Sequence, residues 1–438
     1  MSASAVALPA ADALLTEPTD QLADYRPGKF FFSSPNGILL ADGVAGRVAT
    51  GPWGRAAEQI SAELAACAEQ GLGEGRPDGP VAVGVVPFDL DRPGRLGVPA
   101  SLRESGPFES GGPFAGRPAA PARQGDRPAA VRPIGRAGPG AGSDVNSDVQ
   151  VESLPTPDGY AAAVAEAVRR MRAGELDKVV LARMLRVPGP VDLAALLRRL
   201  AERDPHAYVF AADLPAQADS GAPGDRAARR RTLVGASPEL LISRRGSLVV
   251  SNPLAGSAPR SPDPAEDRAR AAALLASAKN AHEHALVVAA VADALRPFCL
   301  GLDVPAAPSL IRTASMWHLS TRISGWLADP SISSLQLAAA LHPTPAICGW
   351  PVDTARAVIG ELEPFDRDCY TGVVGWCDAA GNGEWALAIR CAQIGDDGAL
   401  QLYAGAGIVA ESVPADELAE TSAKFRTLGS AMGLKENL

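Results

Sequence analysis

The chain has 438 residues, of which 47% are hydrophobic and 5% aromatic, and it carries a formal net charge of −9 at pH 7. This length suits one large domain or two to three ordinary ones, with ample apolar material for a core. The negative charge argues against nucleic acid or an anionic membrane surface as the main partner, although a locally positive pocket can still bind an anionic small molecule.

The six cysteines favour buried thiols over disulfides or a zinc site. None form a Cys-x-x-Cys pair, and those from Cys348 to Cys391 lie in apolar, strand-like settings, which suits a reducing compartment. The N-terminal sequence lacks a basic start, and no segment approaches the roughly 18 apolar residues of a membrane span. We therefore expect a cytoplasmic protein without a signal peptide or membrane segment.

The first part of the chain alternates strands with a helix. Residues 1–24 are interpreted as a flexible lead, and strands are expected over 30–35, 37–41 and 81–88, with an amphipathic helix over 54–70. From 105 to 148 Gly, Pro, Ala and Arg dominate, so this stretch is predicted to be a disordered insertion. Residues 213–231 form a second polar insertion, predicted to be a long hairpin loop.

The second part continues the alternation to the end of the chain. Helices are expected over 157–173, 193–203 and 263–298, and strands over 177–183, 207–212, 232–235, 240–244, 247–251, 371–377 and 385–391. No repeat of 20–50 residues indicates a solenoid, and no Gly-x-Gly-x-x-Gly or Walker loop follows a strand. Hairpin strands mixed with long helices predict an α+β fold with largely antiparallel sheets.

Two charged residues interrupt apolar strands or the turns between them. Lys178 stands in the strand LDKVVLARML, where it is either a gatekeeper on an edge strand or a buried charge with a partner. In the second case, burial or a neighbouring cation would suit it to act as a general base. Glu239 follows Ser237 in a tight turn. It is either a turn carboxylate with no partner or a general acid whose pKa is raised by burial.

Carboxylates on two helices suggest a cation site. Glu417, Glu420 and Lys424 share one face of the helix that follows the run YAGAG. This face is either a solvated surface with a Glu–Lys pair or a site for a cation beside an anion. Glu283 lies between two histidines. Because i,i+2 histidines point to different sides of a helix, zinc is not expected, and Glu283 pooled with the other two glutamates suits Mg²⁺.

Two further residues suggest contacts with a substrate. His318, in MWHLS, is by default a satisfied core histidine. Arg390, in the predicted strand 385–391, needs a partner, and a carboxylate suits its guanidinium best. A carboxylate-rich metal cluster with Arg390, Lys178 and Lys424 implies a substrate with at least two carboxylates.

Taken together, a series of ordered motifs resembles the chorismate-utilising enzymes and, within them, the isochorismate synthases. The resemblance runs from about residue 156 to the C-terminus, and FFFSSPNG at 30–37 is similar to members of siderophore pathways. The motifs are LDKVVLAR, GASPELL, SNPLAGSAPR, HEH, MWHLS, LHPTPAICGWP, GVVGWCD, EWALAIRCA and YAGAGIV with the helix that follows it.

The resemblance implies one chorismate-binding domain over 25–438, with two antiparallel sheets face to face, flanked by helices, and the site in a cleft between them. It also implies Mg²⁺-dependent conversion of chorismate to isochorismate. Lys178 corresponds to the base that activates water for attack at C2, and Glu239 to the acid that protonates the departing C4 hydroxyl. Glu283 and Glu420 correspond to the Mg²⁺ carboxylates, with Glu417 as a direct or water-mediated helper.

The resemblance also implies the substrate contacts. Those beside the ring carboxylate are Gly256, Ser257 and Lys424, those that hold the pyruvyl carboxylate are Arg390, Tyr403 and the Gly405 amide, and those that line the ring are His318 and Ala346. Ammonia-using relatives lack a lysine at the position of Lys178, so water is the expected nucleophile and no glutamine amidotransferase subunit is expected. A monomer is the usual form.

Three alternatives remain open at this stage. Salicylate synthase is the nearest: Ser257 and Ala346 are of the isochorismate type, whereas Tyr370 stands where siderophore-type synthases often have Phe. A catalytically inactive binding homologue is another, although each catalytic position holds the expected residue type. The third is that the isochorismate serves menaquinone synthesis. The motifs FFFSSP and HPTPAICGWP instead favour the enzymes that supply 2,3-dihydroxybenzoate for catecholate siderophores.

Overall fold

A computed structural model describes residues 22–48, 51–73, 76, 78–106, 151–214, 231–395 and 397–431. Almost all of the predicted lead (1–24) and of the predicted insertions (105–148 and 213–231) therefore lies outside the described residues. Within the described part, no helix is long and apolar enough to cross a membrane.

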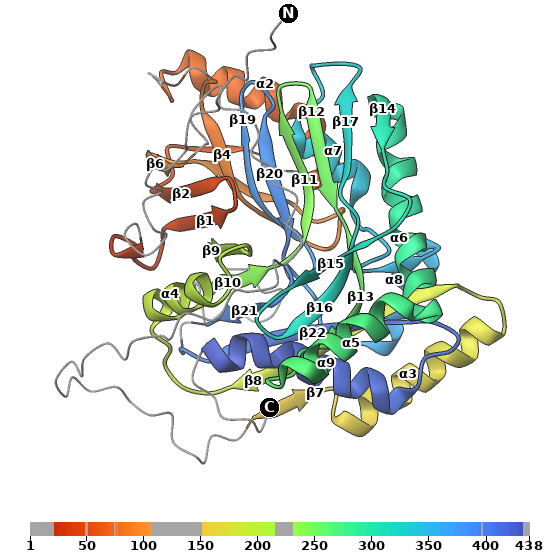
Figure 1. The fold of residues 1–438 in the computed structure, drawn as a ribbon. Coiled ribbons are helices and arrows are strands. Elements are labelled where there is room, and N and C mark those ends of the chain that lie inside the picture. Colours follow the sequence, from red (N-terminus) through yellow and green to blue (C-terminus); the bar gives the residue numbers. More distant parts are fainter. Residues whose placement is uncertain are drawn as a thin grey trace, which may run out of the picture.

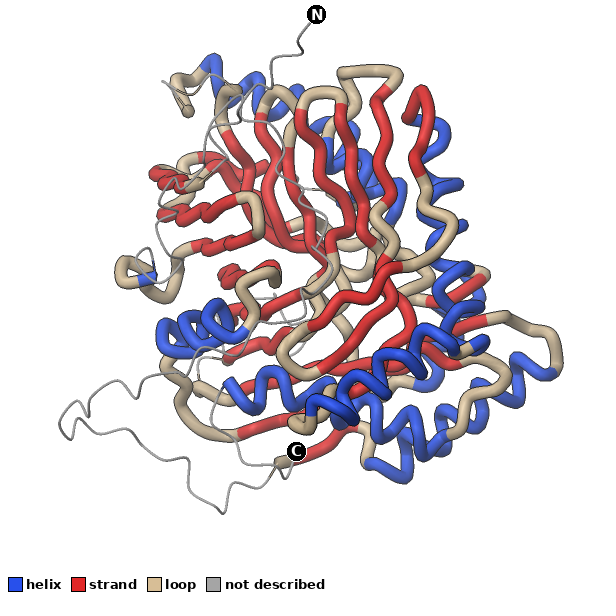
Figure 2. Tube along the Cα trace, in the orientation of Figure 1, coloured by secondary structure: helices blue, strands red, loops and turns tan. Residues whose placement is uncertain are grey.

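Two large sheets dominate the fold (Figure 2). Every strand pair among the described residues is antiparallel. The first sheet runs in the order β18 (Gly349–Trp350), β8 (Lys178–Val187), β22 (Leu400–Ile408), β21 (Cys391–Ile394), β10 (Arg231–Ser237), β9 (Tyr208–Leu214), β1 (Phe30–Ser34), β2 (Gly37–Asp42) and β6 (Ser101–Ser105), with β7 (Glu152–Leu154) paired to β8. The second runs in the order β14 (Cys299–Asp303), β17 (Ile323–Leu327), β12 (Leu248–Asn252), β11 (Leu240–Arg245), β20 (Gly383–Leu387), β19 (Val373–Asp378), β4 (Val81–Val86), β5 (Arg95–Val98) and β3 (Gly46–Val48).

The two sheets share an apolar interior. One buried cluster takes Phe32 from β1, Tyr403 from β22, Val250 from β12 and Trp376 from β19, so both sheets contribute to it. Fully burying a side chain of this kind stabilises the fold by roughly 1.5–3 kcal/mol. The predicted α+β fold with two facing antiparallel sheets is confirmed. A small third sheet, which was not predicted, consists of β13 (Leu254–Pro259), β16 (Met316–Ser320) and β15 (Ser309–Arg312).

Helices cover the outer faces of both sheets (Figure 1). Those against the second sheet are α2 (Trp53–Glu69), α6 (Ala278–Leu295) and α7 (Ser334–Leu341). Those against the first are α3 (Pro157–Arg172), α4 (Leu193–Arg203), α8 (Val352–Leu362) and α9 (Pro414–Ala431). The flanking helices of the predicted fold are thus confirmed.

The predicted helical region 263–298 is not one helix. It contains α5 (Pro264–Ala276), α6 and the short 3₁₀ turn η1 (Arg296–Phe298). Ser277 separates the first two with extended backbone, and its hydroxyl accepts a hydrogen bond from the Asn280 amide at the start of α6. A serine N-cap satisfies one of the free amides of a new helix. This break gives α6, which carries Glu283, its own direction.

The prediction that Arg390 lies in the middle of a strand is wrong. The strand β20 ends at Leu387 and β21 begins at Cys391, and between them Arg390 has a φ of +49°. At this point the chain passes from the second sheet to the first. The nearly continuous apolar run over 385–391 predicted one strand. A change of sheet depends on tertiary pairing, which a local pattern does not contain.

Candidate active site

A pocket opens between the sheets where the chain passes from one sheet to the other. The passage from β10 to β11 contains Glu239, and the passage from β20 to β21 contains Arg390. The Ala236 amide donates to the Arg390 carbonyl at 3.1 Å, so the two passages lie side by side. The residues that line the pocket are Val180, Pro238, Glu239, Leu254, Ala255, Gly256, Ser257, Glu283, His318, Ala346, Ile347, Tyr370, Thr371, Ile389, Arg390, Tyr403, Ala404, Gly405, Gly407, Glu420 and Lys424.

Glu239 is a buried carboxyl in the wall of this pocket. It is 4% exposed, and burial raises its pKa to about 7. The Leu254 amide donates to Glu239 Oε1 at 3.2 Å. The backbone amide of Glu239 donates to the Ser237 hydroxyl, also at 3.2 Å. Near neutral pH this carboxyl can therefore donate or accept a proton. The alternative of a turn carboxylate with no partner is wrong.

Lys178 lies at the start of β8 and is fully buried, so it is not an edge-strand gatekeeper. Its Nζ lies 2.8 Å from Glu283 Oε1. The contact lacks hydrogen-bond geometry, so the Lys178 ammonium has no hydrogen-bond acceptor within the described ranges. Buried donors without an acceptor are uncommon and mark candidate functional groups. Lys178 does not line the pocket itself and meets it through Glu283.

The absence of a side chain at Gly407 makes room for this ion pair. Gly407 lies in β22, opposite Val180 of β8. A Cβ at this position would collide with Glu283 Oε1 and would lie 3.0 Å from Lys178 Cε. Glycine at this position thus allows the ion pair to approach the backbone of β22 closely.

The glutamates of α9 are also paired with lysines. Glu417 accepts from Lys279 Nζ of α6 at 2.9 Å and from the Ser412 hydroxyl at 2.6 Å. Glu420 pairs with Lys424 Nζ at 2.7 Å and accepts from the Ser257 hydroxyl at 2.9 Å. This face of α9 is therefore not a solvated surface, since Glu417 is only 1% exposed.

The donor set of these carboxylates suits a hard cation such as Mg²⁺. Glu283 and Glu420 line the same pocket. Burial raises the pKa of Glu417, and the charge of Glu420 adds to the rise, so the two carboxylates interact. In the described residues the three carboxylates do not form a ready cluster of metal ligands, and a lysine pairs with each of them. The residue types fit the ion, and a metal would compete with the lysine partners.

The pocket also contains a buried arginine beside a histidine. Arg390 Nη2 lies 3.3 Å from His318 Nε2. Burial lowers the pKa of Arg390 to about 10, and burial together with the Arg390 charge lowers the pKa of His318 well below its usual value. His318 is therefore neutral at pH 7 and accepts a hydrogen bond from the guanidinium. The strand register places His318 opposite Ser257, another pocket residue.

Two tyrosines and two glycines shape the floor of the pocket. The rings of Tyr370 and Tyr403 stack with centroids 4.9 Å apart. The Gly405 carbonyl accepts from Lys424 Nζ at 2.8 Å, and a Cβ on Gly405 would lie 3.0 Å from the Tyr370 hydroxyl. At Gly256 a φ of +78° and the close approach of Asn280 favour glycine.

The structure brings most of the predicted site residues to one pocket. Lys178 and Glu417 are the exceptions, because each lies behind the lining and reaches it through a charged neighbour. Sequence reasoning missed Thr371 and Ile347 as lining residues, and it considered Tyr370 without placing it in the site. Thr371, with a φ of +59°, begins the predicted strand 371–377, which starts at Val373 in the structure. A local pattern gives no signal for such a residue.

The chain is similar to several known proteins. A family model described as "Chorismate binding enzyme" matches residues 140–433. Isochorismate synthase DhbC of Bacillus subtilis is 47% identical over 415 residues, which cover 94% of this chain and 96% of the relative. Vibriobactin-specific isochorismate synthase of Vibrio cholerae is 40% identical over 415 residues, which cover 93% and 92%. The crystal structure of the putative 2,3-dihydroxybenzoate-specific isochorismate synthase DhbC from Bacillus anthracis matches with a TM-score of 0.80 and 42% identity, covering 95% of this chain and 100% of that one.

Proposed function

Because this chain belongs to the family of chorismate-binding enzymes, we propose that it converts chorismate to isochorismate. The relatives described above match over almost their whole length and are called isochorismate synthases. The observation that carries this assignment is Glu239. It is a buried carboxyl with a pKa of about 7, in a pocket that also contains the cationic side chains of Arg390 and Lys424. A substrate with two carboxylates matches those two cations.

In the net reaction the ring loses its hydroxyl at C4 and gains a hydroxyl, derived from water, at C2. Lys178, acting as the free amine, takes a proton from the water whose oxygen bonds to C2. The ring double bonds then shift, and the C4–O bond breaks. Glu239 donates its proton to the departing hydroxyl, which leaves as water, so one water enters and one leaves. A base and an acid on separate elements suit attack and departure at different ring atoms. Because Lys178 Nζ contacts Glu283, this step requires the Glu283 carboxylate to move away from it.

The remaining residues bind and orient the substrate in this proposal. Arg390, Tyr403 and the Gly405 amide hold the pyruvyl carboxylate, while His318 and Ala346 line the ring. Gly256, Ser257 and Lys424 lie beside the ring carboxylate. Glu283 and Glu420, with Glu417 as helper, would hold a Mg²⁺ ion, which would neutralise that carboxylate.

Incubation of the purified protein with chorismate and Mg²⁺ tests this function. We expect isochorismate with little pyruvate, measured by chromatography and a coupled pyruvate assay. Release of pyruvate with an equal amount of salicylate would contradict the proposal and favour a salicylate synthase. The absence of any turnover, with chorismate still bound, would favour an inactive binding homologue.

Several finer points belong to the same proposal. Residues 25–438 act as one chorismate-binding domain, as a monomer and without an amidotransferase subunit. The six free cysteines support a reducing cytoplasm. The vibriobactin-specific and 2,3-dihydroxybenzoate-specific relatives described above favour supply of 2,3-dihydroxybenzoate for a siderophore over menaquinone synthesis.

A further inference from the structure

A buried ion pair lies directly behind the wall of the pocket and has no part in the chemistry proposed above. Glu363 follows α8, and its Oε1 lies 2.6 Å from Arg367 Nη2, with each side chain only 3% exposed. Burying two charges is costly unless their geometry and their remaining hydrogen bonds are complete. The contacts of the pair therefore indicate what it is for.

All five N–H groups of Arg367 have acceptors. Nε donates to Glu363 Oε2 at 2.8 Å, and Nη2 donates to Glu363 Oε1 at 2.6 Å and to the Val180 carbonyl at 2.7 Å. Nη1 donates to the Ile347 carbonyl at 2.8 Å and to Thr371 Oγ1 at 3.3 Å. A guanidinium has no further donor to offer. The three acceptors outside the pair come from three separate segments, and each of those residues lines the pocket.

The pair also completes an interrupted strand edge. On its outer edge, β8 pairs with β18 at its first two residues and with β7 over three residues near its far end. Between them, the Val180 carbonyl accepts from Arg367, and the Ala182 amide donates to Glu363 Oε1 at 2.8 Å. The two side chains thus take the place of a neighbouring strand in the segment that follows Lys178.

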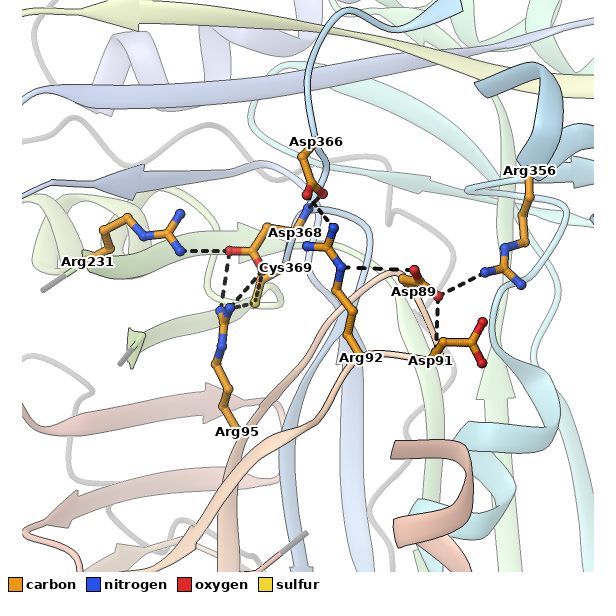
Figure 3. A network of polar contacts seen from close by, with 9 residues as sticks. All are labelled: Asp89, Asp91, Arg92, Arg95, Arg231, Arg356, Asp366, Asp368 and Cys369. Carbon is orange, nitrogen blue, oxygen red and sulfur yellow. Dashed lines mark hydrogen bonds and ion pairs between the residues drawn. The ribbon is translucent and has the colours of Figure 1, made fainter. Parts of the chain in front are cut away.

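Ion pairs also hold the residues before and after Arg367 in this loop (Figure 3). Asp366 pairs with Arg92, and Asp368 pairs with Arg95 at 2.8 Å and with Arg231 at 3.1 Å. The aspartates on either side of Arg367 therefore bind arginines of other segments, while Arg367 itself is buried against the pocket wall. The loop is fixed on both of its faces.

We propose that Arg367 and Glu363 are positioning residues for the reaction described above, on which this inference rests. They set the position of β8, which carries Lys178, relative to the wall segments at Ile347 and Thr371. The pyruvyl and metal contacts proposed above come from Arg390, β22, α6 and α9. Among the described residues, the hydrogen bonds of the pair go to other segments. Its loss should therefore impair turnover more than substrate binding, because small displacements of a reacting group are costly.

Kinetics of an Arg367→Lys variant test the proposal. Lysine keeps the charge but cannot supply five donors in one plane. We expect kcat to fall about 10- to 100-fold while KM changes less than about threefold. The matched control is Arg92→Gln, which removes an exposed ion pair of the same loop and should leave kcat within about twofold. A folded Arg367→Lys enzyme with wild-type kcat and only a lower melting temperature would overturn the proposal.

A double variant and an exchange measurement guard against misfolding. Glu363→Leu with Arg367→Met removes both charges together, which a folded core tolerates better than the loss of one. It should fold, lose turnover as the single variant does, and lose hydrogen-exchange protection at the Ala182 amide while β11 stays protected. Retained protection would overturn the proposal. If the wild type failed to convert chorismate, the proposed function would fail, and the exchange result would still decide whether the pair fixes β8.

Discussion

The two sides of the pocket treat buried carboxylates in opposite ways. Toward α6 and α9, Glu283, Glu417 and Glu420 are each paired with a lysine. At the passage from one sheet to the other, Glu239 has a backbone amide for a partner, and burial raises its pKa to about 7. On the paired side a lysine compensates each carboxylate and a bound cation could take its place, whereas Glu239 can keep a proton. The partner of each carboxylate, rather than its residue type, determines which of the two it does.

The largest effect should come from removing the lysine that links the paired side to the chemistry. Lys178→Ala should lower kcat by about 10²–10⁴-fold, because the proposed general base is lost. Mg²⁺-dependent binding of chorismate, measured by calorimetry, should persist. The variant also leaves Glu283 without its ion-pair partner, so circular dichroism must show a folded protein. Unchanged turnover would remove Lys178 from the role of base.

On the unpaired side, Glu239 should make the free energy of unfolding depend on pH. Below pH 4.5, the ordinary pKa of a glutamate, Glu239 is protonated in both the folded and the unfolded state. As the pH rises toward 7, the unfolded carboxyl ionises while the folded one keeps its proton, so the free energy of unfolding falls. The loss approaches about 3 kcal/mol once the pH exceeds the folded pKa.

Glu239→Gln provides the reference for that prediction. Its free energy of unfolding should lack this part of the pH dependence, so urea denaturation at pH 5 and pH 8 should give a smaller difference than in the wild type. The variant should also lose about 10²-fold in kcat, because glutamine cannot donate a proton to the leaving hydroxyl. Parallel pH curves for both proteins would show that Glu239 ionises normally in the folded state.

Local patterns predicted one side of the pocket better than the other. Helical spacing placed Glu417, Glu420 and Lys424 on one face, and the ion pair between the last two confirms that spacing. The partner of Glu417 is Lys279, 138 residues away in the sequence, so no local pattern could have supplied it. The assignment of Arg390 to a strand was wrong because of long-range pairing too. The strands before and after Arg390 pair in two different sheets.

The Glu363–Arg367 pair shows the same limit more strongly. Its spacing of i,i+4 suggests an ordinary surface helix pair, which is worth about 0.3–0.5 kcal/mol. In the structure Glu363 instead follows the end of α8, and the pair lies against β8. Burial and long-range acceptors, which appear only in the folded chain, give it its role.

The smallest expected effect is a difference in Mg²⁺ affinity between variants of the two glutamates of α9. Glu420→Gln should weaken Mg²⁺ binding about 10- to 100-fold, because its carboxylate lines the pocket. Glu417→Gln should weaken it less than Glu420→Gln does, because Glu417 is held by Lys279 and Ser412 behind the lining. Calorimetric titration of each variant with Mg²⁺ in the presence of chorismate measures both constants. A larger effect at Glu417 would make it the direct ligand and reverse the order proposed for this helix.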